Sequence, residues 1–245
     1  AWYRRQLDKQ VQEMQASVVY WLSANYRASG AAVAMDESPA DVMRKAMNKL
    51  VKRWKRRFDD MAQKLADRFA NDAMKNADAS LATAFKDAGF TVEFKMTSQM
   101  NNALQATIAE NVGLIRSIPE KYFTEVEGLV MRSVARGRDL SYLTDELQKR
   151  YGITRRRAAF IARDQNNKAT SVVQSARQQA LGITQGIWKH SHAGKKPRQS
   201  HVKANGRLFD LSEGMLIDGE HIMPGELPNC RCTWEAVIPG LSNQD

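Results

Sequence analysis

Apolar residues recur at helical spacing through residues 1–183. Gly and Pro are scarce there, and the apolar positions lie three or four residues apart, the period of one helix face. One such stripe is Leu7, Val11, Met14, Val18 and Leu22. A second and longer helix is expected to begin near Pro39 and to carry a stripe of Met43, Met47, Leu50, Trp54, Phe58, Met61, Leu65 and Phe69. The pattern therefore predicts a helical body.

Proline and glycine are expected to divide the rest of this helical part. Pro119 is tolerated in the first turn of a helix but breaks a helix that runs into it, so separate helices are predicted at 97–116 and 119–136. Gly152 is expected to end a short helix that Ser141 caps, and Thr154 to cap a long helix that follows. Residues 90–95 alternate apolar and polar, which indicates a short extended segment.

The pattern changes after Gly182, where Gly, Pro and Asn become frequent. Strands are predicted at 183–189, 207–211 and 233–238, and Asp218-Gly219 is a typical two-residue hairpin turn. The expected fold class is α+β, with a long helical body followed by a small β-containing domain. The predicted division is a helical body at 1–140, a helical lead-in at 141–183 and a β-rich domain that contains the His and Cys residues at 184–245.

The formal net charge of +10 makes a polyanionic partner plausible. The second helix carries a positive ridge of Lys45, Lys49, Lys52 and Arg56, and a later helix carries Arg155, Arg156 and Arg157. These seven residues are candidates to face nucleic acid, and a solvated helix face is the alternative. No apolar run is long enough to span a bilayer, so no membrane partner is expected.

All four histidines and both cysteines of the chain lie within residues 190–232. Two imidazoles and two thiolates would satisfy tetrahedral zinc, and the candidate ligands are His192, His201, Cys230 and Cys232. Zinc sites usually have two or more residues between paired cysteines, whereas Cys230-Arg231-Cys232 has one. An extended chain would point both thiols to one face and Arg231 to the other. A packed, hydrogen-bonded cluster without a cofactor is therefore favoured, and zinc remains the alternative.

Two further kinds of chemistry are open to these residues. A cysteine activated by His201 or His192 would be a nucleophile, but no acid and base pair or phosphate-binding loop accompanies it, so no enzyme is expected. A disulfide between Cys230 and Cys232 would close a strained loop. Two closely spaced cysteines do not make a secreted disulfide framework, which favours a reducing cytoplasm.

Four motifs follow one another in the tail: Trp188-Lys-His190, Arg198-Gln-Ser-His201, Asn205-Gly206-Arg-Leu-Phe209, and Pro224 through Asn229-Cys230-Arg231-Cys232. Their order resembles that of the phage Mu F-like head-morphogenesis domain. In that family a long helix precedes the tryptophan and carries an Ala-Arg-Thr-Glu-like segment, for which this chain has Ala162-Arg163-Asp164-Gln165. The resemblance covers about residues 141–238.

The resemblance implies a minor capsid protein of a tailed phage that acts in head assembly near the portal vertex. It implies the portal protein, the major capsid protein or both as partners, packaged DNA as a further partner, and a location in the virion head after assembly in the bacterial cytoplasm. It favours a structural cluster of Trp188, His201, Gly206, Asn229, Cys230, Arg231 and Cys232, in which Arg231 bonds carbonyls around the Gly206 turn and Asn229 caps the loop. The alternative functions are those of a nucleic-acid-binding module and of a metal-dependent hydrolase or toxin-like domain.

Overall fold

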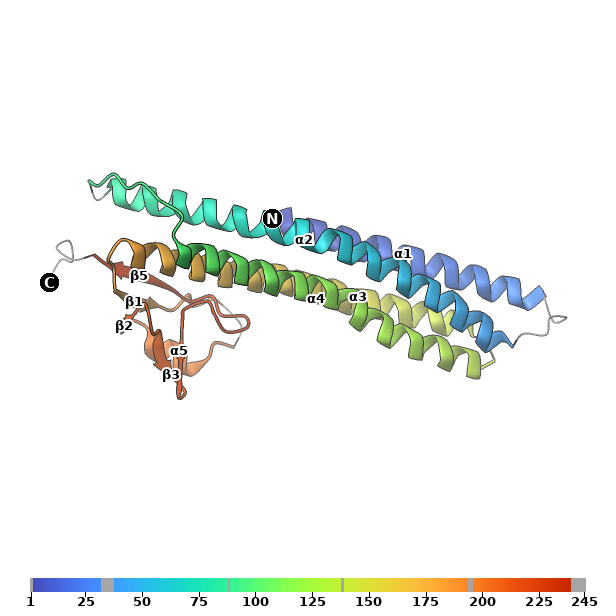
Figure 1. The fold of residues 1–245 in the computed structure, drawn as a ribbon. Coiled ribbons are helices and arrows are strands. Elements are labelled where there is room, and N and C mark those ends of the chain that lie inside the picture. Colours follow the sequence, from blue (N-terminus) through green and yellow to red (C-terminus); the bar gives the residue numbers. More distant parts are fainter. Residues whose placement is uncertain (1, 32–37, 88, 138, 194–195, 239–245) are drawn as a thin grey trace. The chain divides into compact units, whose positions relative to one another are not determined.

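Four long helices precede a small region of short strands (Figure 1). The computed structural model describes residues 2–31, 38–87, 89–137, 139–193 and 196–238, with the backbone alone for residues 28–31. The elements are α1 Trp2–Ala31, α2 Pro39–Asp87, α3 Ser98–Ala135, α4 Leu140–Ala180, β1 Gln185–Lys189, α5 Gln199–Ala204, β2 Leu208–Asp210, β3 Met215–Ile217, β4 Glu220–Ile222 and β5 Thr233–Val237. The α+β prediction is confirmed.

The chain divides into two compact units that interleave along the sequence. The first contains Ala1–Leu65 and Glu110–Ala162, and the second contains Ala66–Ala109 and Arg163–Asp245. Helices α2, α3 and α4 therefore contribute residues to both units. The division predicted at residues 140 and 183 remains a prediction.

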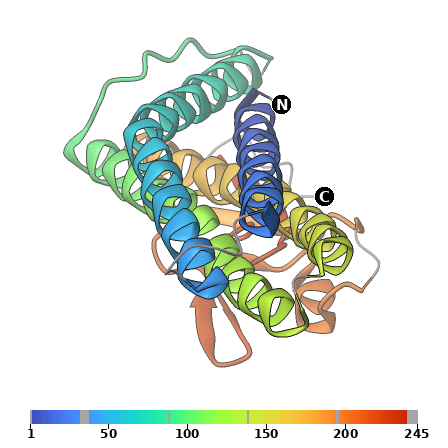
Figure 2. The ribbon, with the colours of Figure 1, turned by 90° about the vertical axis from the view of Figure 1, so that its right-hand side faces the viewer.

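The first unit is a bundle of α1, the start of α2, the end of α3 and the start of α4, which run beside one another in Figures 1 and 2. The predicted stripe of α1 is buried from Leu7 to Leu22, as is most of the α2 stripe, although Met61 is half-buried. Polar contacts join the helices: Tyr3 donates to Asn111 at 2.9 Å, and Gln15 donates to the Leu147 carbonyl at 3.1 Å. Amphipathic stripes thus pack against one another, as their period predicted.

The predicted break at Pro119 is wrong, since α3 continues through it. Ile115, Ile118 and Tyr122 are buried on both sides of the proline and keep one apolar stripe in register. The Ser117 hydroxyl donates to the Leu114 carbonyl at 2.7 Å, within the turn that the proline disturbs. Burial of this stripe outweighs the hydrogen bond that proline removes, because tertiary packing supplies most helix stability in proteins.

The predicted helix end at Gly152 is also wrong, since α4 runs from Leu140 to Ala180 without interruption. Leu143, Leu147, Thr154, Ala158 and Ile161 are buried on either side of the glycine and maintain helical spacing. A glycine inside a helix costs only about 1 kcal/mol relative to alanine, which this packing offsets. Thr154 therefore lies in the middle of a helix instead of capping one.

The second unit contains the strands. β1 is the middle strand of an antiparallel sheet of order β2-β1-β5, and β3 pairs with β4 across the predicted Asp218-Gly219 turn. That hairpin prediction is confirmed, and both turn residues have the positive φ that it requires. Residues 90–97 form no strand, but Val92 and Phe94 pack on the same core as Trp188 and Phe209.

The final turns of α4 bind the sheet through polar side chains. Gln178 accepts a hydrogen bond from the Trp234 ring nitrogen at 2.7 Å, and Ser175 donates to the Leu211 carbonyl at 3.1 Å. Arg177 is buried and donates to both carboxylate oxygens of Asp78, at 2.6 and 2.8 Å, and to the Lys95 carbonyl at 2.5 Å. α4 therefore supports the strands of this unit.

Candidate functional site

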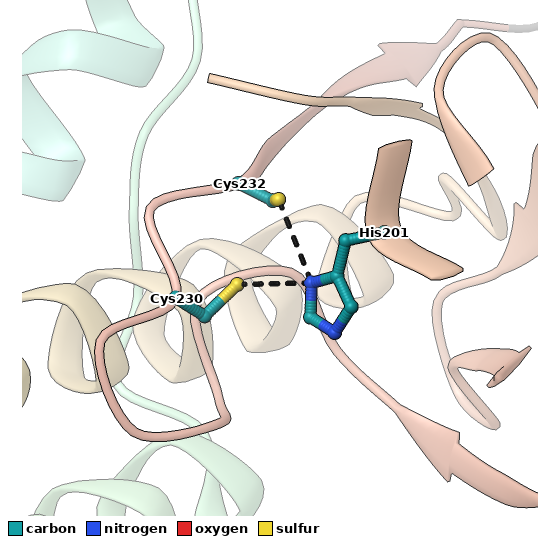
Figure 3. Close-up of side chains that lie close together, drawn as sticks. All are labelled: His201, Cys230 and Cys232. Atoms are coloured by element: carbon teal, nitrogen blue, oxygen red, sulfur yellow. Dashed lines mark hydrogen bonds between the residues drawn. The ribbon is translucent and has the colours of Figure 1, made fainter. Parts of the chain in front are cut away.

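His201, Cys230 and Cys232 converge in the second unit (Figure 3). His201 lies on the short helix α5, while the cysteines lie between the 224–229 turns and β5. His201 Nδ1 is 3.5 Å from Cys230 Sγ and 3.7 Å from Cys232 Sγ. All three residues are buried. Both thiols point to His201 while Arg231 is exposed, which is the arrangement predicted for an extended Cys-Arg-Cys segment.

The pKa values of the two thiols are shifted in opposite directions. A hydrogen bond from the Cys232 thiol is the largest influence on Cys230 and holds its pKa below the ordinary value, with help from the backbone N–H groups of Cys232 and Gly225. The same hydrogen bond, followed by burial, raises the pKa of Cys232. Of the two thiols, Cys230 therefore has the lower pKa.

Trp188 forms one wall of this cluster. It is fully buried on β1, and its ring meets the His201 ring edge-on with 5.3 Å between centroids. Its carbonyl accepts the Gly206 N–H at 2.8 Å, and Gly206 has a φ of +79°. The structure therefore brings together Trp188, His201, Cys230 and Cys232 of the predicted structural cluster, and connects Gly206 through the backbone of Trp188.

Asn229 and Arg231 lie differently from expectation. Asn229 is exposed with a φ of +61°, and its side-chain oxygen accepts a hydrogen bond from Arg163 at 3.2 Å. Arg231 is exposed, and across the described residues its side chain makes no hydrogen bond, so the expected contact with the Gly206 turn is not found. One residue of separation turns Arg231 away from the face that both thiols share.

Helix α4 holds the loop that carries the cysteines, a contact that the sequence did not predict. Asp164 accepts the Asn229 backbone N–H at 2.8 Å, and the Asn167 side chain donates to the Cys230 carbonyl at 2.8 Å. Asp164 occupies the place where the chain departs from the family's Thr-Glu pair. An aspartate on the apolar side of a helix indicates a polar partner. The sequence does not identify that partner, because it is the backbone N–H of Asn229.

His192 lies outside the cluster. It is exposed with a φ of +50°, and its backbone N–H donates to His190 Nδ1 at 3.2 Å. His190 is half-buried, and burial is the largest cause that lowers its pKa, followed by the neighbouring His192. The four predicted metal ligands therefore reduce to three that share a site.

A cavity of about 410 Å³ adjoins the three residues. Its rim carries Lys196, Arg198 and Arg231, and Arg198 also donates to the Pro228 carbonyl at 3.0 Å. The described lining contains no aspartate or glutamate. The cluster thus lies beside a hollow whose charged side chains are basic.

The seven basic residues proposed to face nucleic acid all belong to the first unit. Lys45, Lys49, Lys52 and Arg56 are exposed, and the last three form no ion pair with any described residue. Arg155 pairs with Asp8 at 3.8 Å, and Arg157 donates to Ser117 at 2.9 Å. Arg156 is exposed. The ridge on α2 is therefore the more available part of the predicted surface.

Residues 124–235 match the family model described as Phage Mu protein F like protein. This match confirms, for that segment, the resemblance to the Mu F-like head-morphogenesis family. The chain is also similar to a protein of Haemophilus influenzae (strain ATCC 51907 / DSM 11121 / KW20 / Rd) named "Uncharacterized protein", with 28% identity over 253 residues that cover 100% of this chain and 54% of the relative. The chain thus spans about half the length of that relative. No solved structure matches this chain.

Among the described residues, no helix combines the length and the apolar character needed to cross a bilayer.

Proposed function

We propose that this chain is a minor head protein of a tailed phage that acts in head assembly at the portal vertex. The observation that carries the proposal is the family match over residues 124–235, which includes every tail motif that builds the His201, Cys230 and Cys232 cluster. Its partners are the portal protein and the major capsid protein, and its location is the virion head. The role is one of assembly, not catalysis.

The architecture supports this role in two ways. The helical bundle presents exposed aromatic residues, Tyr20 and Trp21, which are side chains enriched in protein interfaces. The described lining of the tail cavity contains no carboxylate that would serve as a general base. Zinc hydrolases of the zincin type use a glutamate as general base, so the metal-dependent hydrolase has less support than the assembly role.

Co-expression with the portal and major capsid proteins of the same phage tests the proposal. The tagged chain should elute with the portal protein in size-exclusion chromatography and remain bound through a salt wash. Trp21→Ser provides a comparison at the exposed aromatic pair, and Leu208→Ser, an exposed apolar residue on β2, serves as its control. A chain that elutes alone in the presence of both partners contradicts the proposal.

DNA binding through the α2 ridge is a second candidate function. Lys49, Lys52 and Arg56 are exposed and make no ion pair with any described residue, so their charges remain available to phosphates. Such binding would not depend on DNA sequence and would weaken steeply as salt rises. If duplex DNA does not bind at low salt, this second function is excluded and the assembly role is unaffected.

A further inference from the structure

We propose that His201 Nδ1, Cys230 Sγ and Cys232 Sγ bind a zinc ion. In a tetrahedral site with Zn–N of about 2.0 Å and Zn–S of about 2.3 Å, the nitrogen lies about 3.5 Å from each sulfur. The two distances observed are 3.5 and 3.7 Å, and the three ligand atoms all lie within 4.8 Å of one another. Both nitrogen–sulfur distances are therefore those of a tetrahedral zinc site.

Hydrogen bonding alone explains this arrangement less well. One imidazole nitrogen carries either one proton or one lone pair, so it makes one well-directed hydrogen bond. Here Nδ1 lies at nearly equal distances from two sulfurs of different residues. A metal ion between the three atoms would engage both sulfurs and the nitrogen at once.

Hydrogen bonds from the surrounding chain hold the ligand segment in place without a metal ion. The Asn167 side chain donates to the Cys230 carbonyl and Asp164 accepts the Asn229 N–H, so α4 positions the first cysteine through two hydrogen bonds. The Gly225 backbone N–H donates to Cys230 Sγ at 3.3 Å. Such donors to ligand atoms orient the ligands and favour the thiolate form that binds zinc.

The fourth coordination position faces the cavity. All three ligands line this hollow, whereas His192, the fourth ligand predicted from the sequence, does not. Two thiolates balance the charge of Zn²⁺, so binding to the two thiols releases two protons, or fewer where a thiol is already ionised. Lys196, Arg198 and Arg231 at the rim favour water or a small anion in the open position.

Zinc at this place would join α5 to the start of β5. The two elements are connected by a chain segment that includes β2, β3 and β4, and among the described residues they have few other polar links. The ion would thus cross-link the small sheet region and stabilise its fold, because the core of this region is limited in size. This inference does not rest on the assembly role.

Elemental analysis of the full chain, purified under reducing conditions from zinc-supplemented medium, tests the inference. The expected result is near-stoichiometric zinc, lost in His201→Gln, Cys230→Ser and Cys232→Ser. His192→Gln and His221→Gln are matched controls, because both histidines are exposed and lie outside the cluster, and both variants should retain the metal. A wild-type chain without zinc, or zinc lost equally in the two controls, would overturn the inference.

Cobalt provides a readout that does not depend on the folding of the variants. Cobalt added to the reduced, metal-free wild-type chain should produce thiolate-to-cobalt charge-transfer absorption and the strong visible bands of a tetrahedral site, and zinc should displace them. No thiolate band in the wild-type chain would exclude the site. A zinc-free chain that still elutes with the portal protein would refute the metal site and leave the proposed function intact.

Discussion

Asp164 of α4 accepts a hydrogen bond from the backbone N–H of Asn229 at 2.8 Å, and thereby ties the segment that carries both cysteines to the helix. Asp164 is buried, and Lys168 one turn later lies 3.8 Å from its other oxygen. A direct hydrogen bond therefore joins the helix to the closing Asn-Cys-Arg-Cys motif.

Replacement of Asp164 tests this link. Asp164→Ala leaves the Asn229 N–H without its acceptor and should lower the free energy of unfolding by about 1.5–3 kcal/mol, the range for hydrogen bonds to charged groups. Asp164→Asn keeps an acceptor oxygen and should cost less. Urea denaturation gives the stabilities, and amide hydrogen exchange at Asn229 reports the bond itself. Unchanged exchange in Asp164→Ala would contradict the link.

Gly225 approaches α4 so closely that an added Cβ would be crowded. A Cβ at this position would lie 3.3 Å from the Asn167 carbonyl oxygen, and the φ of +87° is unfavourable for other residues. Gly219 has the same φ of +87° but open space around it. Gly225→Ala should therefore destabilise the chain by about 1 kcal/mol more than Gly219→Ala, since only the first adds overpacking to backbone strain. Equal losses in thermal denaturation would show that the close approach has no energetic role.

The buried pair of Arg177 and Asp78 should be important for the stability of the second unit. The Arg177 side chain is 5% exposed and that of Asp78 is 26% exposed. Arg177→Met leaves a half-buried carboxylate and the Lys95 carbonyl without their donor, with an expected loss of about 3 kcal/mol. Arg68→Met is the control, because its pair with Asp72 is exposed and should change stability by less than about 0.5 kcal/mol. Similar losses in both variants would contradict a special role for Arg177.

DNA binding by the α2 ridge would have a specific dependence on salt concentration. If it binds DNA, replacement of Lys49, Lys52 and Arg56 by Gln should reduce the slope of log affinity against log salt by about 2 to 3, because each phosphate contact contributes about 0.9. A matched variant replaces Lys86, Lys203 and Arg207, three exposed basic residues of the second unit, by Gln. Filter binding across a salt series measures both slopes. Equal slopes for the two variants would assign the binding to net charge alone.

Periodicity predicted much of this fold because a stripe such as Leu7 to Leu22 is a local property of the sequence. Pro119 and Gly152 were misjudged because their local cost is small beside the burial of Ile115, Ile118 and Ala158, which depends on partners from other helices. Clustering in the sequence identified His201, Cys230 and Cys232. It did not exclude His192, because the positive φ of this residue is not evident from the sequence. The contacts of Asp164, Asn167 and Arg177 involve backbone groups or distant partners, so they required the structure.

The most direct test of the proposed function is the protein composition of purified heads of the phage that encodes this chain. Quantitative mass spectrometry of proheads and mature heads should detect the chain in far fewer copies than the major capsid protein. Heads made without the gene should be fewer or aberrant. Absence of the chain from both proheads and mature heads, with normal head formation when the gene is removed, would contradict the account.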